Sequence, residues 1–154
     1  MPALNARLDV ARALGVPVVY VCDEHDPDDP DLEDWTTHNL KGSQGAAVWG
    51  PLAPKQGDHI VTKSTYSAFT GSTLATLLDD LRVETLVVTG CLTDIGVLAT
   101  ATDALQRGFA VEVPTDSQAG ASPGAEAAAL GILTVMPPYG AARRERLARI
   151  EARA

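Results

Sequence analysis

Side chains able to do chemistry follow two apolar runs of this sequence. Asp23 and His25 come directly after one run, Lys63 ends another, and His38 lies thirteen residues beyond His25. An ammonium group at the end of a buried strand could donate a proton or polarise a carbonyl group. A carboxylate with two imidazoles suits a divalent metal such as zinc. These residues therefore predict a polar site with a lysine and a possible metal centre.

A third group lies where an apolar run turns into a predicted helix, at residues 90–96. The N–H groups at the start of such a helix can bind an anion or a developing oxyanion without any side chain. Cys91 lies at the end of the strand, where a cysteine is more often a small buried hydrophobic residue than a nucleophile. We therefore expect Cys91 to be buried and unreactive.

Each of these interpretations has a plainer alternative. Lys63 could extend its ammonium group from the strand end into water. Asp23, His25 and His38 could belong to a solvated acidic loop without a metal. The turn at 90–96 could be an ordinary helix start capped by Thr93 or Asp94.

Strand and helix patterns alternate along the chain, which predicts an α/β fold: a doubly wound, mainly parallel sheet with helices on both faces. In such a sheet, ligands bind beyond the carboxyl ends of the strands, where the residues above would lie. The predicted strands are 17–22, 60–62, 85–89, 109–113 and 132–136. The predicted helices are 4–14, 72–81, 94–107, 125–130 and 141–152, with a short helical turn near residue 46.

The chain opens with a helical pattern, whereas a doubly wound domain usually opens with a strand. We therefore expect a single domain over residues 1–154 that is incomplete at its N-terminus, with the first, central strand missing. The loss of a central strand would leave two unpaired sheet edges.

Charge and composition exclude several classes of protein. The net charge is −8, and residues 23–34 hold eight acids and no base, so the rest of the chain is formally neutral. With 5% aromatic residues and basic residues clustered only near the C-terminus, nucleic-acid binding is not expected. No apolar run is long enough to span a membrane. Two cysteines, Cys22 and Cys91, indicate a reducing, cytoplasmic environment.

Three ordered motifs resemble the isochorismatase-like hydrolase superfamily, which includes nicotinamidases and other cysteine amidohydrolases. Residues 35–46 (Trp-Thr-Thr-His-Asn-Leu-Lys-Gly-Ser-Gln-Gly-Ala) resemble a nicotinamidase-type loop. Residues 62–69 resemble the segment with the family's catalytic lysine, and residues 90–104 resemble its nucleophile turn.

The resemblance assigns roles to individual residues. It implies that Lys63 is catalytic and that a divalent metal, zinc or similar, binds Asp23, His25 and His38. It also implies a cis peptide bond between Cys91 and Leu92. The oxyanion-hole N–H groups would belong to Leu92 and Gly96.

Two departures from the family pattern affect the expected activity. The nucleophilic cysteine of the amidohydrolases falls at Gly96, and the family's catalytic aspartate would end the strand that precedes this sequence. The resemblance implies hydrolysis of the C–N bond of small amides, impaired by Gly96. The alternatives are a non-catalytic relative that binds a small amide or aromatic acid, and a vinyl-ether hydrolase, because true isochorismatases also lack the cysteine. Homo-oligomers are common in the superfamily, and the arginine-rich terminal helix could face a partner subunit or solvent.

Overall fold

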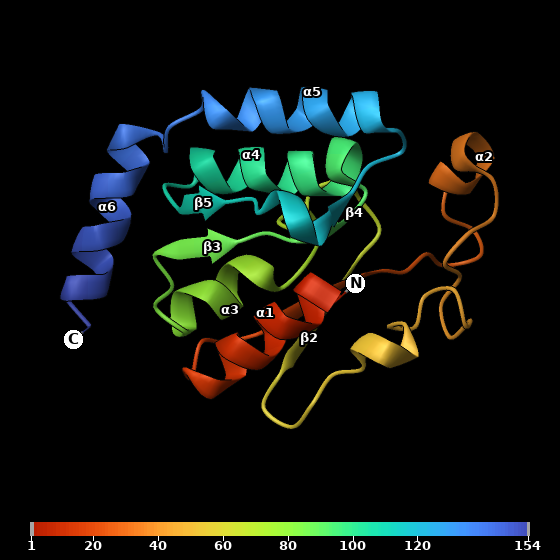
Figure 1. Cartoon of the computed structure of the whole chain (residues 1–154), viewed down its shortest axis with the longest axis horizontal. Helices are drawn as coiled ribbons and strands as arrows, with labels where there is room; N and C mark the ends of the chain where they lie inside the picture. The colour runs from red at the N-terminus through yellow and green to blue at the C-terminus, as the bar shows by residue number, and fades with distance from the viewer. Residues whose placement is uncertain (1, 154) are drawn as a thin grey trace.

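Three pairs of parallel strands and the helices around them make up the computed structural model, which describes residues 2–153. In Figure 1, α4 and α5 stack above β3, α3 lies below it, and α6 runs across one end. Within this range no helix has the length and apolar character needed to cross a bilayer. The strands are β1 (Val19–Asp23), β2 (His59–Lys63), β3 (Thr85–Val87), β4 (Gly90–Cys91), β5 (Ala110–Glu112) and β6 (Gln118–Ala119). The α-helices are α1 (Pro2–Ala13), α2 (Asp31–Trp35), α3 (Leu74–Asp80), α4 (Leu98–Gln106), α5 (Pro123–Thr134) and α6 (Gly140–Glu151).

The expected parallel α/β architecture is confirmed, with strands paired as β1–β2, β3–β5 and β4–β6. Within residues 2–153, no ladder joins the β1–β2 pair to the β3–β5 pair. The sheet therefore has a break between its two halves. The prediction that a further strand belongs at the centre stays a prediction.

Backbone hydrogen bonds show which edge of β1 is used. The His59 N–H donates to the Val18 carbonyl (2.9 Å), and the Glu24 N–H donates to the Lys63 carbonyl (2.8 Å). The backbone N–H and C=O groups of successive residues in a strand point to opposite edges. Those of even-numbered residues in β1 therefore point toward β2, and those of odd-numbered residues point to the other edge. That second edge bonds to no strand in the described part of the chain.

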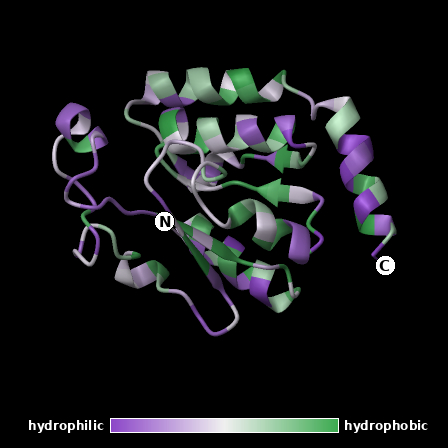
Figure 2. Cartoon of the chain, turned by 180° about the vertical axis from the view of Figure 1, so that it is seen from behind, coloured by the Kyte–Doolittle hydropathy of each residue, from purple (hydrophilic) through white to green (hydrophobic). Residues whose placement is uncertain are grey.

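One hydrophobic core nevertheless holds both halves together. Its buried members come from β2, from α3 with the loop before it, from α4, and from the residue before β5: Val61, Ala68, Phe69, Leu74, Leu78, Ala104 and Phe109. Partly buried residues of β1 and β3 pack against this cluster. Figure 2 shows the same division, with hydrophobic strands inside and a mostly hydrophilic α6 outside.

Two local predictions were wrong. Residues near Ala46 form a turn rather than a helix, because Gly42 has φ +75° and the Ser43 Oγ accepts the Ala46 N–H (3.4 Å). The predicted last strand, 132–136, is instead the end of α5 and the residues after it. Ser122 caps α5 by accepting the Ala125 N–H (3.2 Å), and the helix continues through the apolar run.

An acidic stretch expected to be a loop contains a short helix, α2. Asp31, Glu33 and Asp34 lie in its first turn, where negative charge interacts favourably with the helix dipole. The predicted helix that follows β4 also differs in detail from the structure. A π-helical turn, η2 (Thr93–Val97), precedes α4, so the predicted helix 94–107 begins with a wider turn.

The terminal helix α6 packs closely on the end of α4. Gly108 has φ +84°, and a Cβ atom there would lie 2.4 Å from the Ala142 carbonyl carbon. Only glycine allows this approach of the two backbones. Arg146 is buried within the chain, so neither of the two alternatives for this helix, a partner subunit or solvent, describes this residue.

An ion pair anchors α1 to the loop before β2, and we expect Asp58→Asn to lower the free energy of unfolding. The Arg12 Nη2 lies 2.6 Å from the Asp58 Oδ2, and the Asp58 side chain is 4% exposed. A shielded, charge-assisted hydrogen bond of this kind contributes about 2 kcal/mol. Urea unfolding at pH 7 measures the loss, and Asp9→Asn is the control, because Asp9 is exposed and lies 3.6 Å from Arg12.

The effect of Asp58→Asn should depend on pH. The Arg12 guanidinium holds the pKa of Asp58 below its usual value. A lowered pKa in the folded state stabilises the fold above the unfolded-state pKa of about 4, and this contribution is lost as pH falls through the folded-state pKa. The difference in the free energy of unfolding between wild type and Asp58→Asn should therefore disappear in strong acid. A gap that stays constant with pH would contradict this assignment.

Candidate active site

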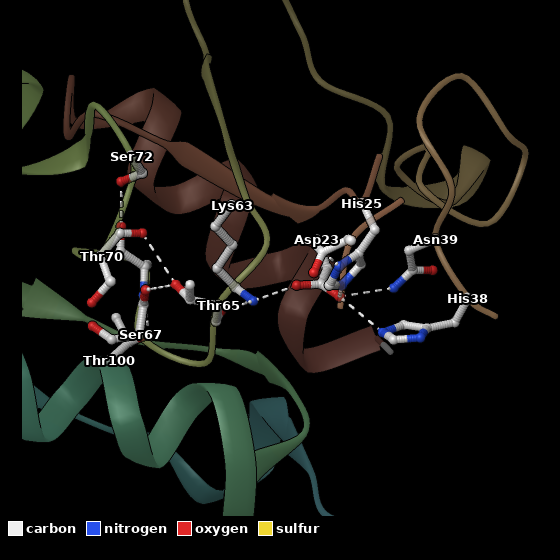
Figure 3. Close-up of polar contacts among 12 residues, drawn as sticks. Asp23, His25, His38, Asn39, Lys63, Thr65, Ser67, Thr70, Ser72 and Thr100 are labelled. Atoms are coloured by element: carbon white, nitrogen blue, oxygen red, sulfur yellow. Dashed lines mark hydrogen bonds and ion pairs between the residues drawn. The ribbon is translucent and has the colours of Figure 1, made fainter. Parts of the chain in front are cut away.

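The register of β1 and β2 brings the first two candidate residues together. Asp23 and Lys63 are direct partners at the carboxyl ends of these parallel strands. Side chains at partnered positions project to the same face of a sheet. The Lys63 Nζ accordingly lies 2.6 Å from the Asp23 Oδ1, as Figure 3 shows.

Lys63 is held inside the protein rather than extended into water. Its side chain is 13% exposed, and the Nζ also donates to the Thr65 carbonyl (2.7 Å). The solvent-facing alternative is therefore wrong. Two fixed acceptors leave the ammonium group one further N–H, since it has three. That donor is available for a substrate.

The loop after Lys63 is fastened to α4. The Ser67 Oγ donates to the Asp103 Oδ2 (2.8 Å), and the Ala68 N–H donates to the Thr100 Oγ1 (3.0 Å). The Thr65 hydroxyl donates to the Ser67 carbonyl (3.0 Å) within the same loop. These bonds fix the Thr65 carbonyl that positions the Lys63 ammonium group (Figure 3).

Asp23, His25 and His38 lie together and can offer ligand atoms within 4.8 Å of one another. The Nε2 atoms of His25 and His38 lie 3.2 Å and 3.5 Å from the Asp23 Oδ2. The other ring nitrogen of each histidine forms a hydrogen bond outside the cluster. The His25 Nδ1 bonds to Asp29 (2.9 Å), and the His38 Nδ1 bonds to the Thr36 carbonyl (2.8 Å). Outer partners of this kind orient metal-binding histidines, so the donor set fits a divalent metal.

A short backbone bridge brings His38 to the site. The His25 N–H donates to the Asn39 carbonyl (3.0 Å), and the Lys41 N–H donates to the His25 carbonyl (2.9 Å). Asn39, with φ +42°, also donates through Nδ2 to the Asp23 Oδ2 (3.2 Å). Sequence reasoning missed Asn39 and Asp29 as supporting residues, although Asn39 lies inside the motif 35–46.

Charges in the cluster shift two pKa values. Burial raises the pKa of Asp23, but the hydrogen bond and charge of Lys63, with help from Asn39 and His25, outweigh it and leave this pKa below the usual value. Burial lowers the pKa of His25, but its bonds to Asp29 and Asp23 outweigh this effect and raise it. Asp23 is therefore a carboxylate at neutral pH, as a metal ligand or a lysine partner must be.

The turn 90–96 carries the remaining candidates. The Cys91–Leu92 peptide bond is cis, the geometry that the family resemblance implied. Gly96 lies in the π-helical turn, and a Cβ atom there would meet only the Tyr66 carbonyl oxygen, at 3.7 Å. The position therefore has room for a Cβ atom, which glycine does not supply. The oxyanion-hole roles of Leu92 and Gly96 stay predictions.

The two cysteines differ in their surroundings. Cys91 is exposed, so the expectation that it is buried was wrong. Cys22 is partly buried, and burial with the nearby charge of Glu24 raises the pKa of its thiol. A raised pKa keeps a thiol protonated and unreactive at neutral pH.

Two exposed aromatic residues connect the loops that carry the site. The Trp35 Nε1 donates to the Tyr66 hydroxyl (2.7 Å), and the two rings meet edge to face. Trp35 precedes His38 by three residues, and Tyr66 follows Lys63 by three. Exposed aromatic faces next to a polar cluster can contact a planar ligand.

Two relatives match long stretches of this chain. The isochorismatase family protein PncA of Bacillus subtilis is 36% identical over 106 residues, which are 62% of this chain and 58% of that protein. A probable inactive nicotinamidase of Arabidopsis thaliana is 31% identical over 134 residues, covering 80% of this chain and 68% of that protein. This chain thus spans less than two thirds of the length of the Bacillus relative.

Solved structures show the same fold. An isochorismatase-like hydrolase from Alkaliphilus metalliredigens has a TM-score of 0.85 and 27% identity over 88% of this chain and 76% of that one. N-carbamoylsarcosine amidase from Thermoplasma acidophilum has a TM-score of 0.76 and 35% identity, over 82% and 74%. The pyrazinamidase of Pyrococcus horikoshii, solved in complex with zinc, has a TM-score of 0.80 and 26% identity, over 86% and 79%.

The family assignment follows from several independent observations. The lysine–aspartate pair lies at the carboxyl ends of parallel strands, next to the Asp–His–His cluster. Residues 1–142 match the Isochorismatase domain as a whole. The chain therefore belongs to the isochorismatase-like hydrolase family and is related to nicotinamidases and amidases.

Proposed function

We propose that this chain hydrolyses the C–N bond of a small, planar amide without a cysteine nucleophile. The observation that carries the proposal is the largely buried Lys63 side chain, whose ammonium group lies 2.6 Å from Asp23 and keeps one N–H for a ligand. Amide-hydrolysing relatives, such as N-carbamoylsarcosine amidase, support the substrate class. Gly96 supports water rather than a thiol as the nucleophile.

The chain's own residues would act on the amide in three ways. The rings of Trp35 and Tyr66 would hold its planar face, and the Lys63 ammonium group would donate a hydrogen bond to its carbonyl oxygen. As water adds to the carbonyl carbon and the C–N bond breaks, Lys63 would give a proton to the departing nitrogen. The proton that the added water loses would restore the Lys63 ammonium group. The products would be a carboxylic acid and ammonia or an amine.

Asp23, His25 and His38 would hold the divalent metal. Such an ion lowers the pKa of bound water and polarises carbonyl groups.

Turnover of small amides tests the proposal directly. Nicotinamide, pyrazinamide and N-carbamoylsarcosine would be incubated with the chain and zinc, and ammonia release would be followed. We expect slow but measurable release from at least one of them. Binding without release would favour the non-catalytic alternative, which Gly96 also supports. Turnover of isochorismate instead would favour the vinyl-ether alternative.

We expect zinc to bind the Asp–His–His cluster and His38→Ala to weaken that binding at least a hundredfold. The variant removes an imidazole whose Nε2 faces Asp23 and whose Nδ1 is already held by a carbonyl group. Loss of an outer-shell partner costs 10- to 100-fold, and loss of a ligand costs more. Calorimetric titration of the metal-free protein with zinc measures the affinity.

The control for the zinc experiment is His59→Ala. His59 is the third histidine of the chain and begins β2, away from the cluster. Its loss should leave the zinc affinity unchanged. An equal loss in both variants would place the zinc site elsewhere.

A further inference from the structure

A second polar site lies between α3, the end of α4 and α6, on a different part of the molecule. A cavity of about 180 Å³ is lined by Ala75, Asp79, Arg107, Phe109, Arg146 and Arg149. A neighbouring cavity shares three of these residues and adds Arg82 and Arg153. Neither cavity is lined by any residue of the Asp23–Lys63 site.

Arg146 is the buried centre of this second site. It is 3% exposed, its guanidinium lies over the Phe109 ring (3.4 Å), and both terminal nitrogens donate to the Asp79 Oδ1 (2.6 and 2.8 Å). Its Nε is buried and has no hydrogen-bond partner in the described residues. A buried donor without a partner costs free energy, and in native structures a bound ion or water is one explanation for such a donor.

The other two arginines of the larger cavity, Arg107 and Arg149, also have N–H groups that their hydrogen bonds to carboxylates do not use. The Arg107 Nε donates to Asp103 (2.6 Å), and the Arg149 Nη1 donates to Glu145 (2.9 Å). Each guanidinium has five N–H groups, so both retain several that these bonds do not use.

The local charge is opposite to that of the whole chain. The two cavities bring together five guanidinium groups, whereas the carboxylates that bind them belong to Asp79, Asp103 and Glu145. Among residues 2–153 this gives an excess of about two positive charges, in a chain whose net charge is −8. An anion with two negative charges would balance it.

From these observations we infer that the cavity between α3 and α6 binds a phosphate group, either as the free ion or as part of a small phosphorylated metabolite. Arginine matches the planar, multi-donor contacts that phosphate oxygens accept. The volume admits one such group with its bound waters. This inference is independent of the hydrolase function.

Paired arginine variants test the phosphate site. The chain would be titrated with inorganic phosphate, and separately with glucose 6-phosphate, at constant ionic strength set with sodium chloride, and the rise in Tm would give the affinity. The test variant is Arg149→Gln, because Arg149 lines both cavities and is partly exposed. The matched control is Arg144→Gln, which removes the same charge from an exposed position of the same helix.

We expect wild type and Arg144→Gln to bind alike and Arg149→Gln to bind at least tenfold more weakly. The tighter of the two ligands would identify the source of the phosphate group. An equal loss in both variants would show only a general charge effect and would overturn the inference. The absence of any rise in Tm with either ligand would overturn it as well. Circular dichroism checks that both variants are folded.

Discussion

Lys63→Met should reduce amide hydrolysis by about a thousandfold. Methionine keeps the apolar stem but removes the ammonium group that lies 2.6 Å from Asp23 and 2.7 Å from the Thr65 carbonyl. A positioned proton donor contributes 10²- to 10⁴-fold to a rate. The measurement is kcat/KM for ammonia release from the amide that the wild-type chain hydrolyses fastest.

Lys55→Met is the matched control for this experiment. Lys55 is 62% exposed and pairs with the exposed Asp9, so its loss should leave the rate unchanged. Lys63→Met also leaves Asp23 without the partner that does most to lower its pKa, so circular dichroism should confirm that the variant is folded. A folded Lys63→Met protein with the wild-type rate would rule out the proposed role of Lys63.

The second large effect is expected from Gly96→Cys. The Cβ atom of the new residue has room, since it would meet only the Tyr66 carbonyl oxygen at 3.7 Å. Gly96 has no positive φ that a larger residue would strain. A thiol in the first turns of a helix has a lowered pKa. We expect this variant to form a thioester with a small amide substrate and to release ammonia at least a hundredfold faster than wild type.

Gly124→Cys is the control that distinguishes a thiol in the candidate site from a thiol that is only near the start of a helix. Gly124 lies in the first turn of α5, also has open space for a Cβ atom, and lies outside the candidate site. Both new thiols should react with iodoacetamide, but only that of Gly96→Cys should gain the mass of an acyl group. If neither or both variants are acylated, position 96 does not face the substrate.

Sequence reasoning succeeded where geometry follows from strand order alone. Asp23 and Lys63 each end an apolar run, and parallel strands place such ends side by side. Strand order alone does not place His38, because it reaches the site only through the backbone bridge between His25 and Leu40. Asn39 and Asp29 were missed for the same reason, since their roles depend on how the loop closes.

The errors in secondary structure have a different cause. The apolar run at 132–136 fits a strand or a buried helix equally well by its pattern. Ser122 and Pro123 start α5 ten residues earlier, and the helix simply continues into the run. The burial of Arg146 could not be predicted either, because it depends on Asp79 and Phe109, which lie far away in the sequence.

The break in the sheet should give a characteristic pattern of hydrogen exchange at the backbone amides of β1 and β3. The Ala110 N–H donates to the Glu84 carbonyl and the Val88 N–H to the Glu112 carbonyl, so even-numbered residues of β3 face β5. As in β1, its odd-numbered residues face an edge that no strand covers within residues 2–153. Along both strands, amide hydrogens should therefore alternate between slow and fast exchange with heavy water.

That alternation would disappear once both edges are covered. A strand seated between β1 and β3 would accept and donate hydrogen bonds along the odd-numbered positions, and every amide in these strands would then exchange slowly. The hydrogen-exchange pattern of two short strands thus reads out directly whether the sheet is continuous in the working protein.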